Sequence, residues 1–204
     1  MSSQCVWIGV GVAIDESNVL YENLVAMRDF LSLNYNNTLK DEFHLNLYDV
    51  AVPEENLDMT VEIVSKIAGG QKKMKIGIRS VDYFPFGPIV IRLEKDKELL
   101  SLHADIVAAI NPLRGTCVEP GYLEEKRKYT EQQKEMLARY GNPFVFGEFN
   151  PHITVGFIKQ PDRLENAKEA VKPFLTQTEF MVDNLNLVRE VVGGYRELHR
   201  IQLV

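Results

Sequence analysis

Apolar and polar residues alternate along several short segments of the chain, and the first of them lies near the N-terminus. Between Cys5 and Ile14, one set of alternate positions carries aliphatic side chains, at Val6, Ile8, Val10, Val12 and Ile14. The intervening positions are mostly small, at Trp7, Gly9, Gly11 and Ala13. Because side chains two positions apart point the same way in a strand, the pattern predicts a strand with one buried face. The small face either lets another group approach the backbone or packs closely under a helix.

Further elements follow along the whole chain. Alternation predicts strands at 41–50, 73–84, 89–93, 150–157, 179–190 and 195–203. Helical spacing of apolar residues, with Ser, Pro, Gly or Asn near the ends, predicts helices at about 17–33, 53–70, 97–110 and 161–173. The segment 121–140 is rich in Glu, Lys, Arg and Gln and is interpreted as a solvent-facing helix. No linker separates these elements, so we expect one α+β domain.

The charge balance limits the ligands that the protein can bind. The 204-residue chain is 45% hydrophobic and carries 23 Lys plus Arg against 29 Asp plus Glu, a net charge of -6. A protein that grips long nucleic acid through many phosphates is usually basic. We therefore expect no long nucleic acid partner, and an anionic ligand that is small or met by a local patch.

Cys5 and Cys117 are far apart in the sequence and form neither a CxxC motif nor a Cys/His cluster. We therefore expect no disulfide framework, no zinc module and a reducing compartment. The apolar run near the N-terminus is ten residues long and follows MSSQ, which lacks basic residues. It is too short to cross a bilayer. The expectation is a cytoplasmic protein without membrane contact.

An internal repeat is the strongest signal. DEFHLNLYDVAVPEENLDMTVEIVSKI and GEFNPHITVGFIKQPDRLENAKEAVKPF share Glu-Phe, a His-containing strand and a helix begun by proline. The interval from His to Pro is nine residues in both, from His44 to Pro53 and from His152 to Pro161. We interpret residues 1–204 as a single bilobal domain, with lobes at roughly 1–83 and 84–204 that exchange strands.

The repeat gives each histidine a partner. A lone His152 would most simply be a core or edge residue, but two related strands packed about a two-fold axis would bring His44 and His152 face to face. Asn46 and Thr154 stand two positions after the histidines and share their strand faces. An imidazole titrates near pH ~6.5, so one ring can accept a proton while the other donates one. The pair therefore indicates acid–base chemistry on a phosphoryl group.

These motifs resemble the 2H phosphoesterases, which include bacterial RNA 2′,5′-ligase-like proteins and cyclic nucleotide phosphodiesterases. The family pattern is two His-x-Thr/Ser-x motifs, matched fully by HITV at 152–155 and, except for Asn46, by HLNL at 44–47. FPFGP before IVIRL and the closing FMVDNLNLVRE are also similar. The resemblance implies two pseudo-symmetric lobes of antiparallel-rich sheet with flanking helices around a central cleft.

The resemblance also implies the roles of the paired residues. His44 and His152 would be the catalytic pair, and Asn46 and Thr154 would hold the nonbridging phosphate oxygens. The substrate would be a small nucleotide or RNA-end phosphodiester, such as a 2′,3′-cyclic phosphate or a 2′,5′ linkage. No metal or other cofactor is expected, and the protein would be a monomer. An amide can donate to phosphate but is longer than a hydroxyl, so Asn46 leaves open a nucleotide-binding module with little or no turnover.

Other residues are secondary candidates. Trp7, Tyr48 and Phe84 could stack on a base, with Tyr48 expected on the face of His44, although core packing explains each of them equally well. Arg79 and Arg92 are candidates for phosphate contact that the sequence does not place. His103 is interpreted as a packed residue, and His199 as an edge or surface group. A metallohydrolase using His44 and His152 as ligands is weaker, because no third ligand stands at a spacing such as HExxH.

Overall fold

The computed structural model describes residues 4–39, 42–125, 127–192 and 194–204. Alternating segments form strands and amphipathic segments form helices in the following order: β1 (Cys5–Ala13), α1 (Tyr21–Tyr35), β2 (His44–Pro53), α2 (Leu57–Gly70), β3 (Met74–Tyr83), β4 (Pro88–Leu93), α3 (Lys97–Ile110), α4 (Glu131–Tyr140), β5 (His152–Phe157), α5 (Leu164–Val171), β6 (Glu179–Val182), β7 (Asn184–Val191) and β8 (Gly194–Gln202). The single-turn 3₁₀ segments Glu54–Asn56 and Pro161–Arg163 lead into α2 and α5.

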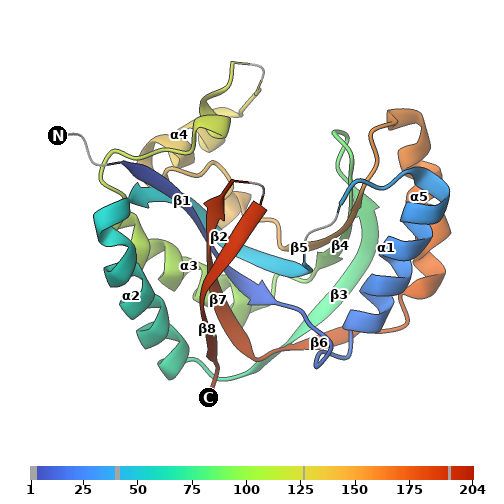
Figure 1. Cartoon of the computed structure of the whole chain (residues 1–204), viewed down its shortest axis with the longest axis horizontal. Helices are drawn as coiled ribbons and strands as arrows, with labels where there is room; N and C mark the ends of the chain where they lie inside the picture. Colours follow the sequence, from blue (N-terminus) through green and yellow to red (C-terminus); the bar gives the residue numbers. More distant parts are fainter. Residues whose placement is uncertain (1–3, 40–41, 126, 193) are drawn as a thin grey trace.

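The strands form one eight-stranded sheet in the order β6-β3-β4-β5-β2-β1-β7-β8, and neighbouring strands pair antiparallel. Figure 1 shows the sheet curling between two pairs of helices. Helices α1 and α5 pack on β5 and β3, whereas α2 and α3 pack on β7, β8 and β2. The predicted α+β class, with antiparallel sheet and flanking helices, is confirmed.

The sheet is pseudo-symmetric about the β5–β2 junction, with β6-β3-β4-β5 on one side and β2-β1-β7-β8 on the other. Strand β3 lies in the half that contains β5, and β7 and β8 lie in the half that contains β2. Strands from residues 1–83 and strands from residues 84–204 thus occur in both halves of the sheet. The two halves of the sheet are therefore interdependent.

The helix-covered face of the sheet forms the core. Ile8, Val10 and Val12 of β1 are fully buried there, as the alternating pattern predicts. The opposite face of β1 carries Trp7, and Gly9 and Gly11 keep its backbone uncovered by large side chains. This face of the sheet also carries the two histidines.

Two predicted helices have different limits in the structure. Helix α1 begins at Tyr21 rather than at Ser17, because Ser17 donates both its amide and its hydroxyl to Asp15 in the preceding turn. The expected helix over 121–140 is wrong for its first half. Helix α4 begins after Thr130, whose hydroxyl accepts the amide of Gln133 in a reciprocal capping box, a strong local start signal. Of the preceding segment, Lys126 lies outside the described residues.

The expectation that the cysteines are unpaired is wrong, because Cys5 and Cys117 form a disulfide, with Cα atoms 5.8 Å apart. Their separation of 112 residues hides their proximity, since the turn after α3 returns to the start of β1. Persistent disulfides are typical of oxidising compartments. The cysteines therefore no longer support the expectation of a reducing compartment.

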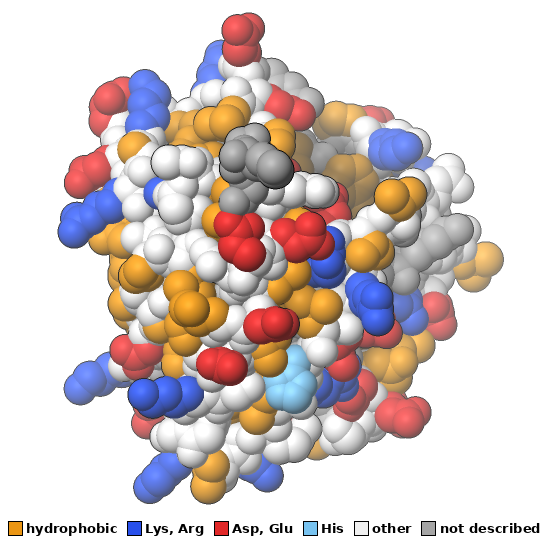
Figure 2. Space-filling view, turned by 60° about the vertical axis from the view of Figure 1, so that its left-hand side comes forward, with side chains coloured by type: hydrophobic (Ala, Val, Ile, Leu, Met, Phe, Trp, Pro, Cys, Tyr) orange, Lys and Arg blue, Asp and Glu red, His pale blue; other side chains and the backbone are white. Residues whose placement is uncertain are grey.

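Within the described residues, no helix is both long and apolar enough to cross a bilayer. On the face shown in Figure 2, acidic and basic side chains are interspersed over the described surface, and no broad basic patch stands out among them.

Candidate active site

The two motif strands, β2 and β5, are neighbours at the centre of the sheet. Leu45 pairs with Ile153, and both side chains are fully buried on the helix side. The residues on either side of this pair must therefore face the opposite side of the sheet. In this antiparallel register, His44 lies across from Thr154 and Asn46 lies across from His152. Diagonal neighbours across such a pair have Cβ atoms about 7–8 Å apart or less, so the two histidines lie close together on this face of the sheet.

A β-bulge follows each motif at the same place. The register of β1 with β2 shifts so that Asn46 pairs with Gly11 and Tyr48 with Val10, which leaves Leu47 as the extra residue. The register of β4 with β5 shifts in the same way around Val155. The internal repeat thus extends to a backbone irregularity, and each bulge ends the stretch in which the motif residues share one face.

Both imidazoles are anchored in the same way. His44 Nδ1 lies 3.0 Å from the carbonyl oxygen of Glu42, and His152 Nδ1 lies 2.7 Å from that of Asn150. A carbonyl oxygen can only accept, so each Nδ1 carries a proton and donates it. In each ring the Nε2 atom is therefore left to exchange a proton with a ligand. His44 is exposed and His152 is half-buried.

His152 has a defined environment. Its ring meets the Phe84 ring edge-to-face at 5.0 Å, and Arg92 pairs with it across β4 and β5. Burial is the main cause that lowers the pKa of His152; the carbonyl of Asn150 acts in the opposite direction, and the charges of Arg92 and His44 lower it further. The lowered pKa favours the neutral imidazole, which can accept a proton at Nε2.

Arg92 is aimed at the site by two contacts. Its Nε donates to Asp82 Oδ2 at 3.1 Å, and its guanidinium lies 4.2 Å from the centre of the Phe84 ring. Its Nη1 is buried and has no hydrogen-bond partner among the described residues. The positively charged guanidinium of Arg92 can therefore donate a hydrogen bond to an oxygen atom of a ligand beside His152. The sequence alone does not indicate that Arg92 lies beside His152, because the pairing of β4 with β5 brings the two residues together.

Asn46 is held by a buried acid. Its Nδ2 donates to Asp49 Oδ2, which leaves the second N–H of the amide for another acceptor. Burial, the largest cause, and the nearby charge of Glu119 raise the pKa of Asp49 to about 7, although the bond from Asn46 acts to lower it. No feature of the sequence singles out Asp49. The bulge at Leu47 turns Asp49 to the face of Asn46.

The same bulge overturns the expectation that Tyr48 shares the face of His44. Tyr48 pairs with Val10 on the helix side, is 2% exposed, and donates its hydroxyl to the Tyr140 carbonyl at 2.6 Å. It is a core residue and does not face the histidines. Gly156 is likewise turned to the helix side, because a β-carbon there would meet Leu31 of α1 at 2.5 Å.

Trp7 and Phe84 lie on the open face, but at different distances from the histidines. Phe84 contacts His152 directly and stacks on the exposed Phe86 at 5.4 Å. Trp7 lies further along β1, against Tyr195 at 5.1 Å. Phe84 is therefore part of the histidine cluster, whereas Trp7 lines a separate cavity.

His103 and His199 lie outside the site. His103 is buried; its Nδ1 donates to the Leu47 carbonyl at 2.7 Å and its Nε2 accepts the Phe146 amide at 2.9 Å. It thus satisfies a carbonyl that the bulge removes from the strand ladder. His199 is exposed on the edge strand β8. Both interpretations are confirmed. Among the described residues, no three His, Cys, Asp or Glu side chains are grouped so as to hold a metal ion.

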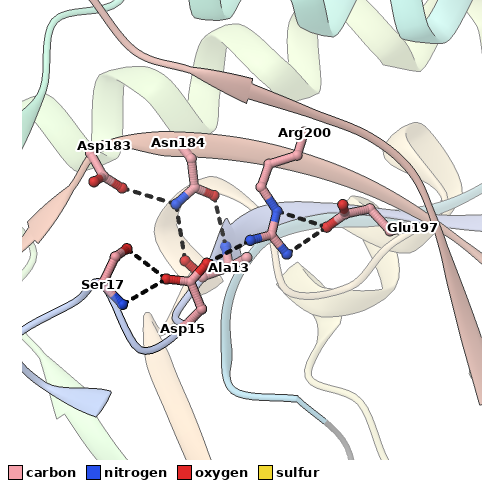
Figure 3. Close-up of polar contacts among 7 residues, drawn as sticks. All are labelled: Ala13, Asp15, Ser17, Asp183, Asn184, Glu197 and Arg200. Carbon is pink, nitrogen blue, oxygen red and sulfur yellow. Dashed lines mark hydrogen bonds and ion pairs between the residues drawn. The ribbon is translucent and has the colours of Figure 1, made fainter.

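A cavity of about 180 Å³ adjoins the start of β2, lined by Ala13, Ile14, Asp15, Tyr21, Arg28, Glu42, Phe43 and Arg200. Its wall is a polar network, drawn in Figure 3. Arg200 Nη1 donates to Asp15 at 2.7 Å, and the Asn184 side chain bonds both the amide and the carbonyl of Ala13 at 3.0 Å. Because Ala13 pairs with His44, this network fixes the strand beside the imidazole.

The family of the chain is decided by a sequence match over most of its length. A family model described as the 2′-5′ RNA ligase superfamily matches residues 22–194. The chain belongs to this superfamily. The resemblance to the 2H phosphoesterases is thereby confirmed, and membership of the 2′-5′ RNA ligase superfamily supports an enzyme with a phosphodiesterase-type function. No curated protein sequence matches the chain significantly.

Solved structures share the fold of this 2′-5′ RNA ligase superfamily member. TT0787 of Thermus thermophilus matches with a TM-score of 0.60 at 17% identity over 97% of each chain. E. coli LigT complexed with ATP matches with a TM-score of 0.60 at 12% identity over 99% of each chain. A structure described as a phosphoesterase matches with a TM-score of 0.56 at 10% identity, covering 98% of this chain and 99% of the other. At these identities the likeness establishes the fold.

Proposed function

We propose that the protein is a metal-independent phosphoesterase that cleaves a small nucleotide or RNA-end phosphodiester, namely a 2′,3′-cyclic phosphate or a 2′,5′ linkage. The observation that carries this proposal is the pairing of Leu45 with Ile153, which gives His44 and His152 one common face. Their Nδ1 atoms are both engaged by the backbone, so two Nε2 atoms remain for one phosphoryl group.

The reaction divides the proton transfers between the two rings. His152, whose lowered pKa favours the neutral form, takes a proton from water as the water oxygen attacks phosphorus. The bond from phosphorus to one ribose oxygen breaks, and His44 donates a proton to that leaving oxygen. The Thr154 hydroxyl and the free N–H of Asn46 donate to the nonbridging oxygens, where negative charge builds up. The product is a phosphomonoester beside a free ribose hydroxyl.

Small nucleotides fit this proposal better than long strands. The net charge of -6 is unfavourable for a strand with many phosphates. E. coli LigT, which shares the fold, has been solved with ATP, with 3′-AMP and with NADP+. We infer that this chain also takes a ligand of one or two nucleotides and acts as a monomer.

The decisive test measures hydrolysis of 2′,3′-cyclic nucleotides and 2′,5′-linked dinucleotides in the presence of EDTA. We expect turnover by the wild type and a loss of about 100- to 10,000-fold in His44→Ala and in His152→Ala. His199→Ala, which removes an exposed histidine outside the site, is the matched control and should keep full activity. Activity that survives both active-site substitutions would refute the assignment, and loss of activity in EDTA would indicate a metal.

A second function is favoured by Asn46, whose amide is engaged by Asp49 and replaces a hydroxyl. A cleft that binds nucleotides without turning them over would retain the same residues. Calorimetry with nucleoside monophosphates separates the two possibilities. Tight binding without product after hours supports the binding module, whereas turnover excludes it.

A further inference from the structure

A second cavity, of about 140 Å³, lies on the open face of the sheet beyond the histidine pair. Its lining comes from β1, β2, the β7–β8 hairpin and the segment after α3: Trp7, Asp49, Glu119, Gly121, Tyr122, Arg127, Glu190 and Tyr195. The cavity is thus built from both ends of the chain. The proposed phosphoryl chemistry leaves it without a role.

A hydrogen bond links the wall of the cavity to the proposed phosphate site. Asp49, in its wall, accepts the hydrogen bond from Asn46, which lies across from His152. Asn46 and Asp49 are three residues apart on β2, which is at most roughly 10 Å at about 3.3 Å per residue, because the bulge at Leu47 lies between them. A β-carbon at Gly9 would lie 3.0 Å from Asp49 Oδ1 and 3.1 Å from the Trp7 ring. The glycine therefore leaves space between these two side chains of the cavity wall. A nucleoside monophosphate is long enough to span from the histidines to the cavity.

The cavity contains an acceptor that the protein leaves unused. Asp49 Oδ1 is shielded from solvent and has no hydrogen-bond partner among the described residues. A second carboxylate, that of Glu119, lies close enough for its charge to act on Asp49. Glu119 Oε1 accepts the Gly121 amide at 3.3 Å, which fixes this side chain against its own loop. Two acceptors on neighbouring side chains thus face the same space.

Aromatic rings provide the flat walls. Trp7 is half-buried against Tyr195, with ring centres 5.1 Å apart. Tyr122 is half-buried on the other segment, and the Arg127 guanidinium lies 5.6 Å from the centre of its ring. Such rings favour a planar ligand, because every nucleobase has a face that can stack.

We propose that this cavity binds the nucleobase of the substrate and favours guanine. The inference rests on the proposed phosphoesterase function, since the phosphate is what places the base. Guanine carries two adjacent donors on its pairing edge, N1–H and the N2 amino group. These donors match one oxygen of the ionised Asp49 carboxylate and one of Glu119, and stacking against Trp7 or Tyr122 orients the ring.

The other bases present a mismatched edge. Adenine and cytosine each place an acceptor nitrogen beside one amino group, and uracil places one N–H between two carbonyl oxygens. Each would point an acceptor at a carboxylate, which leaves polar groups of the base and the protein unpaired. We expect a preference for guanine of about tenfold to hundredfold in kcat/KM, the range for one or two mismatched polar contacts.

The experiment measures kcat/KM for the four nucleoside 2′,3′-cyclic monophosphates with the wild type, Asp49→Asn, Glu119→Gln and Asp105→Asn. In Asp49→Asn, the new amide oxygen accepts from Asn46 and the amide nitrogen faces the cavity. We expect the preference to move from guanine towards adenine or cytosine, whose edges pair an acceptor with a donor. Glu119→Gln, which does not contact Asn46, should also reduce the guanine preference. Asp105, exposed on α3, is the control and should leave the ratios unchanged.

Ratios of kcat/KM between the four nucleotides test the base site separately from the phosphoryl chemistry. A change at the phosphate site affects all four nucleotides alike and therefore cancels in these ratios. Equal turnover of all four nucleotides by the wild type, or unchanged ratios in both variants, would overturn the guanine site and leave the phosphoesterase intact. Absence of turnover with every nucleotide would count against the phosphoesterase itself. Base preference would then be measured by calorimetry with the four nucleoside 3′-monophosphates, where equal affinities would overturn the site and tighter binding of 3′-GMP would support it.

Discussion

Arg92 sets the charge around His152. The two residues pair across β4 and β5, and the positive charge of Arg92 adds to burial in lowering the pKa of His152. We expect Arg92→Met to raise the pKa of His152, whereas Arg92→Lys, which keeps the charge, should leave it nearly unchanged. An NMR titration of the histidine ring protons measures both. A pKa of His152 that does not move in Arg92→Met would show that the guanidinium is too well screened to matter.

Asp49 makes the stability of the protein depend on pH. Its pKa rises from the usual 3.8 to about 7 in the folded protein, chiefly through burial. Between these values the folded state keeps a proton that the unfolded state has lost, so the free energy of unfolding falls as pH rises through this window. Above pH 7 the loss reaches on the order of 4 kcal/mol at about 1.36 kcal/mol per pKa unit.

Asp49→Asn should therefore raise the free energy of unfolding at pH 8 by a few kcal/mol and change it little near pH 4. Urea unfolding at a series of pH values measures this, with Asp105→Asn, on the exposed side of α3, as the control. A variant that is no more stable at pH 8 than the wild type would mean that Asp49 is better solvated than its surroundings indicate.

At the scale of elements, the close contact of β1 with β2 fixes the site. A β-carbon on Gly11 would lie 2.6 Å from the carbonyl oxygen of Leu45, the residue between His44 and Asn46. We expect Gly11→Ala to displace this segment, lowering the free energy of unfolding by about 1–3 kcal/mol and reducing activity. Gly69→Ala, in α2 with nothing within 4 Å of the new β-carbon, should be neutral or stabilising. Equal behaviour of the two variants in denaturation and activity assays would argue against a tight strand contact.

The motif strands can be predicted from the sequence because their alternation is regular, and the face shared by His44 and Asn46 follows from it. The bulges cannot be predicted, because one extra residue changes the facing of later side chains without altering composition. Strict alternation therefore assigns Tyr48 to the wrong face and does not single out Asp49. The segment before α4 has the composition of a helix because its charged residues are good helix formers, but Thr130 and its capping box begin the helix later.

At the scale of the whole molecule, the disulfide ties β1 to the segment that walls the second cavity. It joins residues separated by 112 positions, and closing a loop of about 100 residues contributes up to ~4.7 kcal/mol in the chain-entropy model, with ~2–4 kcal/mol typical. We expect reduction by dithiothreitol to lower the free energy of unfolding by that typical amount. The Cys5→Ser/Cys117→Ser double variant should be equally destabilised and insensitive to dithiothreitol. No difference between oxidised and reduced protein would contradict a disulfide in solution.

The sequence predicts some long-range features of the molecule and not others. The internal repeat predicts two related strands with facing histidines, because both copies keep the same spacing. The partition of the sheet and the disulfide depend on which distant segments meet in space. A single sequence carries no signal for that, so the sequence does not indicate which strands join which half of the sheet, and the expectation of no disulfide is wrong.

The central claim is that the imidazoles of His44 and His152 act on one phosphoryl group. The most direct measurement is a crystal structure of the protein with a nucleoside 3′-monophosphate bound. We expect one phosphate with an oxygen about 2.7–3.2 Å from each Nε2 atom and near the Thr154 hydroxyl. A phosphate bound elsewhere, or one that reaches only a single imidazole, would contradict the claim.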